Sequence, residues 1–332
     1  MIFLFYIAVF ILSVLLIMVG SDWITDSSVD VAKKIGTSNL AVGLILISFL
    51  LSVPEIVIVL SSVLHGHPAL GLGATLGSVI VNIGLVIGLS ALIKPLHVPR
   101  IMVTRDMIYM TVVSIVVAAL ALEDMVLSRA DGMVLLLLFV PYVINVIEQE
   151  RSLHSADRQI KTEKIIETLK MHGDMKPHPH VQSGWKYLLL GSAALILGSE
   201  MFIQMLLVAA SELHLPDLLI GVTIGALGPS IPNLAAALGA ARKGAEELVI
   251  SETLGSNIFT LLVTLGLLCV FAPQPIDPVT AWVTTPALLL VTLILLMPMV
   301  RGYIHRRDGL LLVLIYISSL MAEFIFRAVN GR

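Results

Sequence analysis

Ten long apolar runs constrain this 332-residue chain more than any other feature of its sequence. A helix needs about 20 consecutive apolar residues to cross the hydrocarbon core of a bilayer. The chain is 58% hydrophobic and only 13% charged, whereas soluble domains are about half apolar and a quarter charged. We therefore predict an all-α membrane protein with ten transmembrane helices. The predicted spans are residues 3–22, 38–64, 69–93, 106–123, 132–148, 185–210, 216–241, 247–271, 280–300 and 309–327.

Composition and motifs also exclude several classes of function. The net charge of −3 is too small to indicate a nucleic-acid partner. The first apolar run lacks a basic n-region and an A-x-A cleavage site, so we interpret it as an uncleaved first span. Cys269 is the single cysteine and lies in an apolar run, which favours a packing role. No HExxH or GxSxG motif and no paired catalytic acids occur, so we expect neither an enzyme nor a prosthetic group.

One long polar segment, residues 149–184, divides the chain into two groups of five spans. The expected units are a first repeat at 1–148, a linker at 149–184 and a second repeat at 185–332. Lys and Arg concentrate on the cytoplasmic side of membrane proteins. With the amino terminus outside, 17 of the 20 basic residues fall on the inner side and 3 on the outer side. We therefore expect a multi-pass protein of the plasma (inner) membrane, with a cytoplasmic linker and both termini outside.

The two groups of spans are related by an internal repeat with one constant offset, which carries Ser52 onto Ser230 and Pro54 onto Pro232. Aligning 40–89 with 218–267 without gaps gives 14 identities in 50 positions, clustered on Ser, Gly and Pro. Because each repeat holds an odd number of spans, the second copy must enter the membrane with the opposite orientation. Inverted repeats of this kind are typical of secondary transporters, whose sites lie near the midplane where helices are interrupted.

Polar residues gather at the repeated motifs. Pro54 and Pro232 each remove a backbone donor, and the freed carbonyls must face protein or a cavity rather than lipid. The side-chain oxygens near them are hard ligands, which suit Na⁺, Ca²⁺ or Mg²⁺ better than soft transition metals. The candidate metal-ligating residues form four symmetric pairs: Ser52 and Ser230, Glu55 and Asn233, Ser78 and Ser256, Asn82 and Thr260.

A purely structural interpretation competes for most of these residues. Ser and Thr in membrane helices often only tie helices together by hydrogen bonds, and a proline can be only a kink. That interpretation is weak for Glu55, because intramembrane carboxylates are costly and mark functional sites. The recurrence of polar positions in pairs favours an ion site.

The motifs resemble those of the calcium:cation antiporter superfamily, which includes sodium/calcium exchangers. "SFLLSVPE" with "TLGSVIVN" resembles the first family motif, and "GALGPSIPN" with "TLGSNIFT" resembles the second. The resemblance implies a sodium/calcium exchanger-like fold and places the eight residues above at ion-coordinating positions. It also implies that backbone carbonyls near Ser48 and Ala226 complete the shell, and that the spans carrying Asp22 and Glu200 slide to switch access.

The sequence departs from the family pattern in its charges. Leu51 and Pro229 stand where the family has Thr, and Asn233 and Thr260 stand where it can have acids, so Glu55 is the only repeat-motif carboxylate. We expect a cation antiporter in the lipid bilayer that uses Na⁺ to drive export of Ca²⁺ or a related cation by alternating access. The alternative is an antiporter of monovalent cations or one coupled to H⁺. A channel is disfavoured, because inverted repeats around an occluded site suit coupled exchange.

Three further features have two interpretations each. Glu252 could supply part of the missing charge or lie at the inner mouth beside Glu246, and the sequence favours the mouth. Asp22 and Glu200 could be gating groups or interfacial ones. The linker histidines, His154, His172, His178 and His180, could sense metal or pH, but a solvated linker is favoured.

Overall fold

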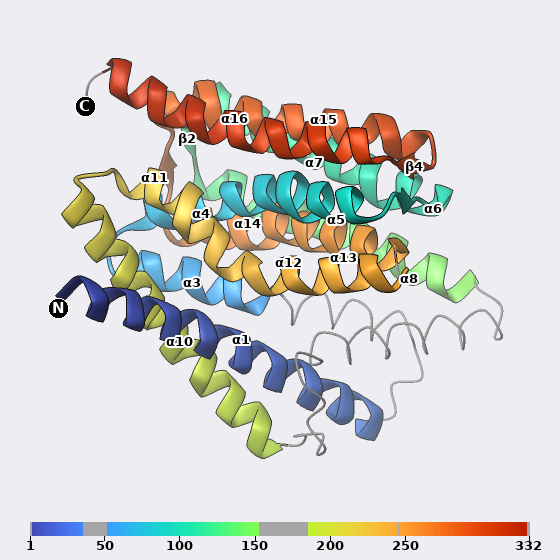
Figure 1. Cartoon of the computed structure of the whole chain (residues 1–332), viewed down its shortest axis with the longest axis horizontal. Helices are drawn as coiled ribbons and strands as arrows, with labels where there is room; N and C mark the ends of the chain where they lie inside the picture. Colours follow the sequence, from blue (N-terminus) through green and yellow to red (C-terminus); the bar gives the residue numbers. More distant parts are fainter. Residues whose placement is uncertain (1, 36–51, 153–184, 245, 331–332) are drawn as a thin grey trace.

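Long helices run side by side through the part of the chain that the structure describes (Figure 1). This computed structural model describes residues 2–35, 52–152, 185–244 and 246–330. The first half contains α1 (Ile2–Ile35), α3 (Val53–Leu64), α4 (Pro68–Val81), η1 (Asn82–Ile87), α5 (Gly88–Ile93), β1 (Leu96–His97), α6 (Arg100–Met102), η2 (Val103–Met107), α7 (Ile108–Glu123), β2 (Val126–Leu127) and α8 (Arg129–Ser152). The second half contains α10 (Trp185–Leu213), α11 (Asp217–Ile220), η3 (Gly221–Gly225), α12 (Ala226–Lys243), α13 (Glu246–Phe259), η4 (Thr260–Thr264), α14 (Leu265–Phe271), β3 (Gln274–Pro275), η5 (Thr280–Thr284), α15 (Thr285–Val300), β4 (Tyr303–Ile304) and α16 (Arg306–Asn330).

Eight helices within the described residues are long and apolar enough to cross a membrane, and a bent pair makes up to nine. They agree with the predicted spans to within a few residues at most ends. The predicted span 38–64 is described only from residue 52 onward, as the shorter apolar helix α3. The eight helices are Phe5–Ile24, Pro68–Ile93, Arg100–Glu123, Arg129–Glu148, Leu189–Leu213, Val249–Phe271, Thr280–Val300 and Arg306–Arg327.

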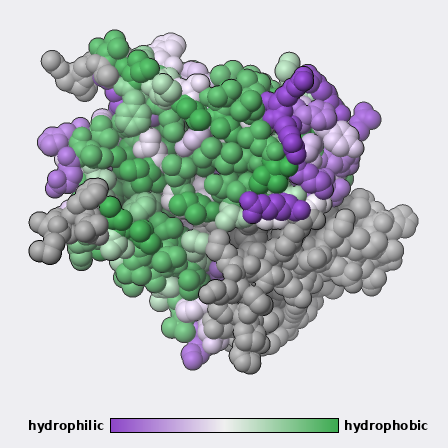
Figure 2. Space-filling model, in the orientation of Figure 1, coloured by the Kyte–Doolittle hydropathy of each residue, from purple (hydrophilic) through white to green (hydrophobic). Residues whose placement is uncertain are grey.

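The outer surface of the bundle is apolar, as a lipid-facing surface must be. Large side chains such as Leu137, Trp282 and Met297 are each more than 60% exposed. On the face that Figure 2 shows, hydrophobic residues cover most of the described surface, and hydrophilic residues gather toward its ends. In a soluble protein, apolar patches of this extent would be a liability. The surface therefore supports an integral multi-pass membrane protein.

Two long helices, α1 and α10, pack against each other along one side of the bundle (Figure 1). Small residues allow this close approach. A Cβ on Gly20 would lie 2.8 Å from the carbonyl oxygen of Gly191, and a Cβ on Gly198 would lie 3.0 Å from the carbonyl oxygen of Ser13. Gly20 and Gly198 are themselves counterparts at the repeat offset. This pair of helices packs on the rest of the protein mainly through α3, with further contacts from α1 to α12 and from α10 to α11 and η3.

Several short elements of the first half have a counterpart in the second half, 178 or 177 residues later in the chain. The π-helical segment η4 begins at Thr260, the repeat counterpart of Asn82 at the start of η1, and β3 begins at Gln274, the counterpart of Leu96 at the start of β1. Segment η5 repeats η2 in the same way, and β4 repeats β2, each starting one position early. The antiparallel pairings are crossed: β1 pairs with β4, and β2 pairs with β3. Each pairing therefore becomes the other when the two halves are exchanged.

The contact between α4 and η3 depends on the absence of two side chains. A Cβ on Gly73 would lie 2.3 Å from the carbonyl oxygen of Leu218, and a Cβ on Gly221 would lie 2.3 Å from that of Leu70. The obstructing atoms are backbone, which cannot move aside as a flexible side chain can. These glycines therefore allow the first half to pack directly on the second.

We expect Gly73→Ala to destabilise the protein strongly. Overpacking a tightly packed contact costs about 1–3 kcal/mol or more, and here the two helix backbones must separate. The change should lower the thermal unfolding temperature in detergent by several degrees. Gly239→Ala is the matched control, because an added Cβ at Gly239 meets no described atom within 4 Å. Equal unfolding temperatures for the two variants would contradict the packing argument.

A candidate cation site

The described part of the first motif lies at the start of a helix. Ser52 is the N-cap residue of α3, and Pro54 occupies the first turn, where the missing N–H costs no hydrogen bond. Glu55 follows in the same turn. Negative charge is stabilised at a helix N-terminus, because the unpaired N–H groups there give it a partial positive charge. The start of α3 therefore places a buried carboxylate, 5% exposed, inside the protein.

The second motif lies at a bend. The helical stretches Asp217–Ile231 and Asn233–Arg242 meet at an angle of 55°, with Pro232 between them. Ser230 is buried just before the bend, and Asn233 is partly buried just after it. The proline of the second repeat thus lies where the helical direction changes, beside two of the candidate ligands.

Both Gly-Ser motifs lead into a π-helical turn. Ser78 is on α4, and Asn82 is the first residue of η1. Ser256 is on α13, and Thr260 is the first residue of η4. Single π turns within α-helices often occur at functional sites. Sequence reasoning did not predict these turns, since an apolar run has no simple π-helical signature.

Tertiary packing brings the motif-bearing elements of the two halves together. Helix α3 contacts α4 and η4, while η1 contacts α12 and α13. Helix α4 also contacts α12 and η4. The eight candidate residues are therefore carried by packed helices from both halves, although they are far apart in sequence.

Many of the candidate oxygens are buried without a hydrogen-bond partner among the described residues. A buried polar atom left unsatisfied costs about 1–3 kcal/mol, so native proteins contain few of them. Six such atoms belong to predicted ligands from both halves of the chain. The atoms are both carboxylate oxygens of Glu55, Ser78 Oγ, Asn82 Oδ1, Ser230 Oγ and Thr260 Oγ1.

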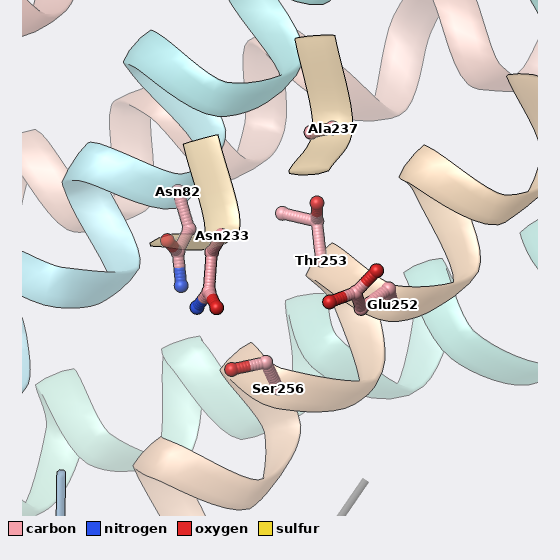
Figure 3. Close-up of a pocket in the computed structure, with 6 residues that line it drawn as sticks. All are labelled: Asn82, Asn233, Ala237, Glu252, Thr253 and Ser256. Atoms are coloured by element: carbon pink, nitrogen blue, oxygen red, sulfur yellow. The ribbon is translucent and has the colours of Figure 1, made fainter. Parts of the chain in front are cut away.

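A small pocket of about 230 Å³, which includes open space, lies between η1, α12 and α13. Three predicted ligands line it: Asn82, Asn233 and Ser256. Figure 3 shows the amide of Asn233 and the hydroxyl of Ser256 directed toward a common space, with Glu252 and Thr253 beside them. The remaining candidates are not among the lining residues of this pocket.

The structure adds a contact surface for Glu252 to the sequence-based preference. The sequence favours the inner mouth for this residue, together with Glu246. The structure places Glu252 in the pocket lining with three predicted ligands. Glu246 instead contacts Lys94, with 2.6 Å between the carboxylate and the ammonium nitrogen. Helical spacing alone could not decide between the two places, because it does not show which neighbouring helix a side chain faces.

Asn257 is a residue that the sequence analysis did not select. It is fully buried, and its Oδ1 accepts a 2.9 Å hydrogen bond from Nδ2 of Asn82. Because the amide nitrogen of Asn82 donates to Asn257, its carbonyl oxygen is the atom left without a partner among the described residues. The triplet Gly255-Ser256-Asn257 is the sequence feature that could have pointed to Asn257. The repeat counterpart of Asn257 is Val79, whose apolar side chain cannot make this hydrogen bond.

Glu200 connects α10 to α3. It accepts hydrogen bonds from Ser61 Oγ at 2.9 Å and from Gln204 Nε2 at 3.1 Å, and its other contact is His65 Nε2 at 2.9 Å. Glu200 therefore lies where the pair of helices α1 and α10 meets α3, the helix of the first motif. The linker histidines discussed above lie outside the described residues.

Among the described residues, no three His, Cys, Asp or Glu side chains form a group that could hold a metal ion. The candidate ligands of the motifs are of a different kind. Apart from the carboxylate of Glu55, they offer hydroxyl and amide oxygens.

The fold and the buried oxygens define a multi-pass helical membrane protein with a polar interior. The sodium/calcium exchanger protein family model matches residues 5–148 and 183–324. The chain belongs to this family of cation antiporters.

Relatives match over nearly the full chain. The inner membrane protein YrbG of Escherichia coli is 30% identical over 289 residues, 86% of each chain. The putative antiporter CaxA of Alkalimonas amylolytica is 30% identical over 93% of this chain and 96% of its own length. The sodium/calcium exchanger MaX1 of Methanosarcina acetivorans is 28% identical over 95% of this chain and 97% of its own length.

Solved structures agree with this assignment. The sodium-calcium exchanger NCX_Mj, in crystals soaked with Na⁺ and Sr²⁺, superposes with a TM-score of 0.65 at 26% identity. The match covers 95% of this chain and 97% of that one. The described helices of this chain thus follow the architecture of a known exchanger.

Proposed function

We propose that this protein is a secondary-active antiporter that exchanges Na⁺ for Ca²⁺ or a related cation by alternating access. The observation that carries the proposal is the set of buried oxygens without hydrogen-bond partners in the described chain, including those of Glu55, Asn82 and Thr260. These atoms come from both halves. One desolvated cation could satisfy several of them together, and hard oxygens are the ligands that Na⁺ and Ca²⁺ prefer.

The proposed architecture is ten spans in two inverted five-span repeats. The crossed pairing of β1 with β4 and of β2 with β3 supports it, because that pattern is unchanged when the halves are exchanged. So does the packing of α1 on α10, the first helix of each half. We take the repeats as residues 1–148 and 185–332, joined by the linker 149–184. Two related units around one site allow the site to open alternately to either side.

The identity of the ions is supported by relatives. MaX1 is a sodium/calcium exchanger, and NCX_Mj has been crystallised with Na⁺ and Sr²⁺. The second candidate is exchange of monovalent cations or of H⁺. It is favoured by Asn233 and Thr260, which leave Glu55 as the only repeat-motif carboxylate. One Na⁺ beside one carboxylate is neutral, whereas one Ca²⁺ keeps a net positive charge.

Flux into proteoliposomes tests the proposal. Imposed gradients of Na⁺, H⁺, K⁺, Ca²⁺ and Mg²⁺ are applied in turn, and uptake of each ion is followed. Na⁺-dependent Ca²⁺ flux in both directions is the expected result. Coupling of H⁺ or K⁺ to Na⁺, without Ca²⁺ movement, would select the second candidate.

The proposed topology has a cytoplasmic linker and both termini outside, in the plasma (inner) membrane. The asymmetry of 17 basic residues against 3 motivates it. A cysteine introduced at Ser155, in a Cys269→Ser background, should therefore react with an impermeant thiol reagent only in inverted vesicles. A cysteine introduced at Gly331 should react in intact cells. Labelling of the Ser155 position in intact cells would overturn the topology.

A further inference from the structure

We propose that Glu252 is a cation-binding residue of this site and supplies the second negative charge that a divalent cation requires. This inference rests on the proposed antiporter function. The repeat motifs do not include Glu252, and its repeat counterpart is Ala74. The site would therefore be asymmetric in charge, with Glu55 from the first half and Glu252 from the second.

The geometry supports direct participation in ion binding. Glu252 and Ser256 are four residues apart on α13, so they share one face of the helix. Both line the pocket that also contains Asn82 and Asn233 (Figure 3). A cation in this pocket would be within reach of one carboxylate, two amide groups and one hydroxyl. That combination of oxygen ligands is typical of Ca²⁺ sites.

The neighbouring acidic residues lie outside the pocket lining. Glu246 forms a 2.6 Å ion pair with Lys94. Glu247 is exposed in the first turn of α13. Neither residue lines the pocket, and Glu252 is the only charged residue that does so within the described chain.

Charge balance explains why a carboxylate here would matter. The N-terminal end of α13 carries partial positive charge, which disfavours a cation approaching from that side. A carboxylate in its second turn offsets this effect. A divalent cation held by Glu55 alone would keep one uncompensated charge in a low-dielectric interior, which is costly. With Glu252 contributing, less of the charge of a divalent cation is left uncompensated.

The position also implies an order of contact. Glu252 lies between Ser256 and the turn that joins α12 to α13, which contains Gly244 with a positive φ of 81°. In the proposed topology that turn is cytoplasmic. A Ca²⁺ ion arriving from the cytoplasm would therefore meet Glu252 before it reaches the buried carboxylate Glu55.

The test compares Glu252→Gln with Glu247→Gln, the matched surface control on the same helix. Ca²⁺ affinity is measured by calorimetry on purified protein and by Ca²⁺ inhibition of Na⁺ flux. We expect Glu252→Gln to weaken Ca²⁺ binding about tenfold or more while Na⁺ affinity changes less than about threefold, and Glu247→Gln to match the wild type. Unchanged Ca²⁺ affinity in folded Glu252→Gln protein would overturn the inference.

Two further measurements keep the test decisive. If Glu252→Gln does not fold, Glu252→Asp retains the charge but shortens the side chain by one methylene, and it should lower Ca²⁺ affinity selectively. Equal loss of Na⁺ and Ca²⁺ binding in that variant would overturn the inference. Loss of flux in Glu55→Gln with unchanged Ca²⁺ affinity in Glu252→Gln would leave the antiporter proposal standing without this residue. No coupled cation flux in the wild type would overturn both.

Discussion

Replacing Glu55 with Gln is expected to abolish coupled transport while leaving the protein folded. Glu55 is the only repeat-motif carboxylate, and both of its oxygens are buried without a hydrogen-bond partner among the described residues. Gln retains the size of the side chain but not the charge that compensates a bound cation. Removing the buried charge also relieves a desolvation cost, so the thermal unfolding temperature should stay the same or rise. Flux in proteoliposomes should fall to the background of empty vesicles.

Glu323→Gln is the matched control for this experiment. Glu323 lies on α16, is 2% exposed, and accepts a hydrogen bond from Thr284 at 2.5 Å. It is therefore another buried intramembrane carboxylate, but it belongs to none of the repeat motifs. Its Gln variant should keep flux close to the wild-type rate. Wild-type flux in well-folded Glu55→Gln protein would show that the central carboxylate has been assigned wrongly.

Restoring an acid in the second motif is expected to strengthen Ca²⁺ binding. Asn233 lines the pocket with its amide group but carries no charge. Asn233→Glu adds a carboxylate close to Ser256 and Glu252, and the number of carboxylates tunes Ca²⁺ affinity. At an effective dielectric constant of about 20, a unit charge about 4 Å from a divalent ion gains several kcal/mol. Repulsion between the carboxylates offsets part of that gain, so we expect Ca²⁺ affinity to rise about 10- to 100-fold.

Asn233→Gln separates the effect of charge from that of size, because it lengthens the side chain without adding an acid. Calorimetry under identical salt should show tighter Ca²⁺ binding for the Glu variant only. Na⁺ affinity should rise less, since a monovalent ion gains half the Coulomb energy. Thr260→Asp, compared with Thr260→Asn, provides an independent repetition at the end of the other motif. Unchanged Ca²⁺ affinity in both acidic variants would refute the charge argument.

The approximate span boundaries could be predicted from the sequence because lipid acts on each helix separately. A run such as 280–300 must be apolar and about 20 residues long wherever it lies in the bundle. The structure has a helix from Thr280 to Val300 there. Eight predicted spans agree in this way within the described residues, while the span 38–64 is described only in its second part.

The candidate ligands were predictable for a second reason, which is repetition. Ser52 and Ser230, or Ser78 and Ser256, are individually unremarkable polar residues in apolar helices. The offset that both pairs share is the reason for predicting them as ligands. The structure adds that Ser78 Oγ and Ser230 Oγ are buried without a hydrogen-bond partner among the described residues.

The membrane class, the repeat and the polar positions could be predicted from the sequence, because they depend on local hydropathy and on spacing along the chain. How the two halves meet could not, because it depends on tertiary contacts. The contact of Gly73 with Gly221, the hydrogen bond from Asn82 to Asn257 and the place of Glu252 in the pocket all join segments that are distant in sequence. Such contacts depend on the helix packing angles and on which face each side chain presents to its neighbour. In an apolar helix with low amphipathicity, residue spacing does not specify that face.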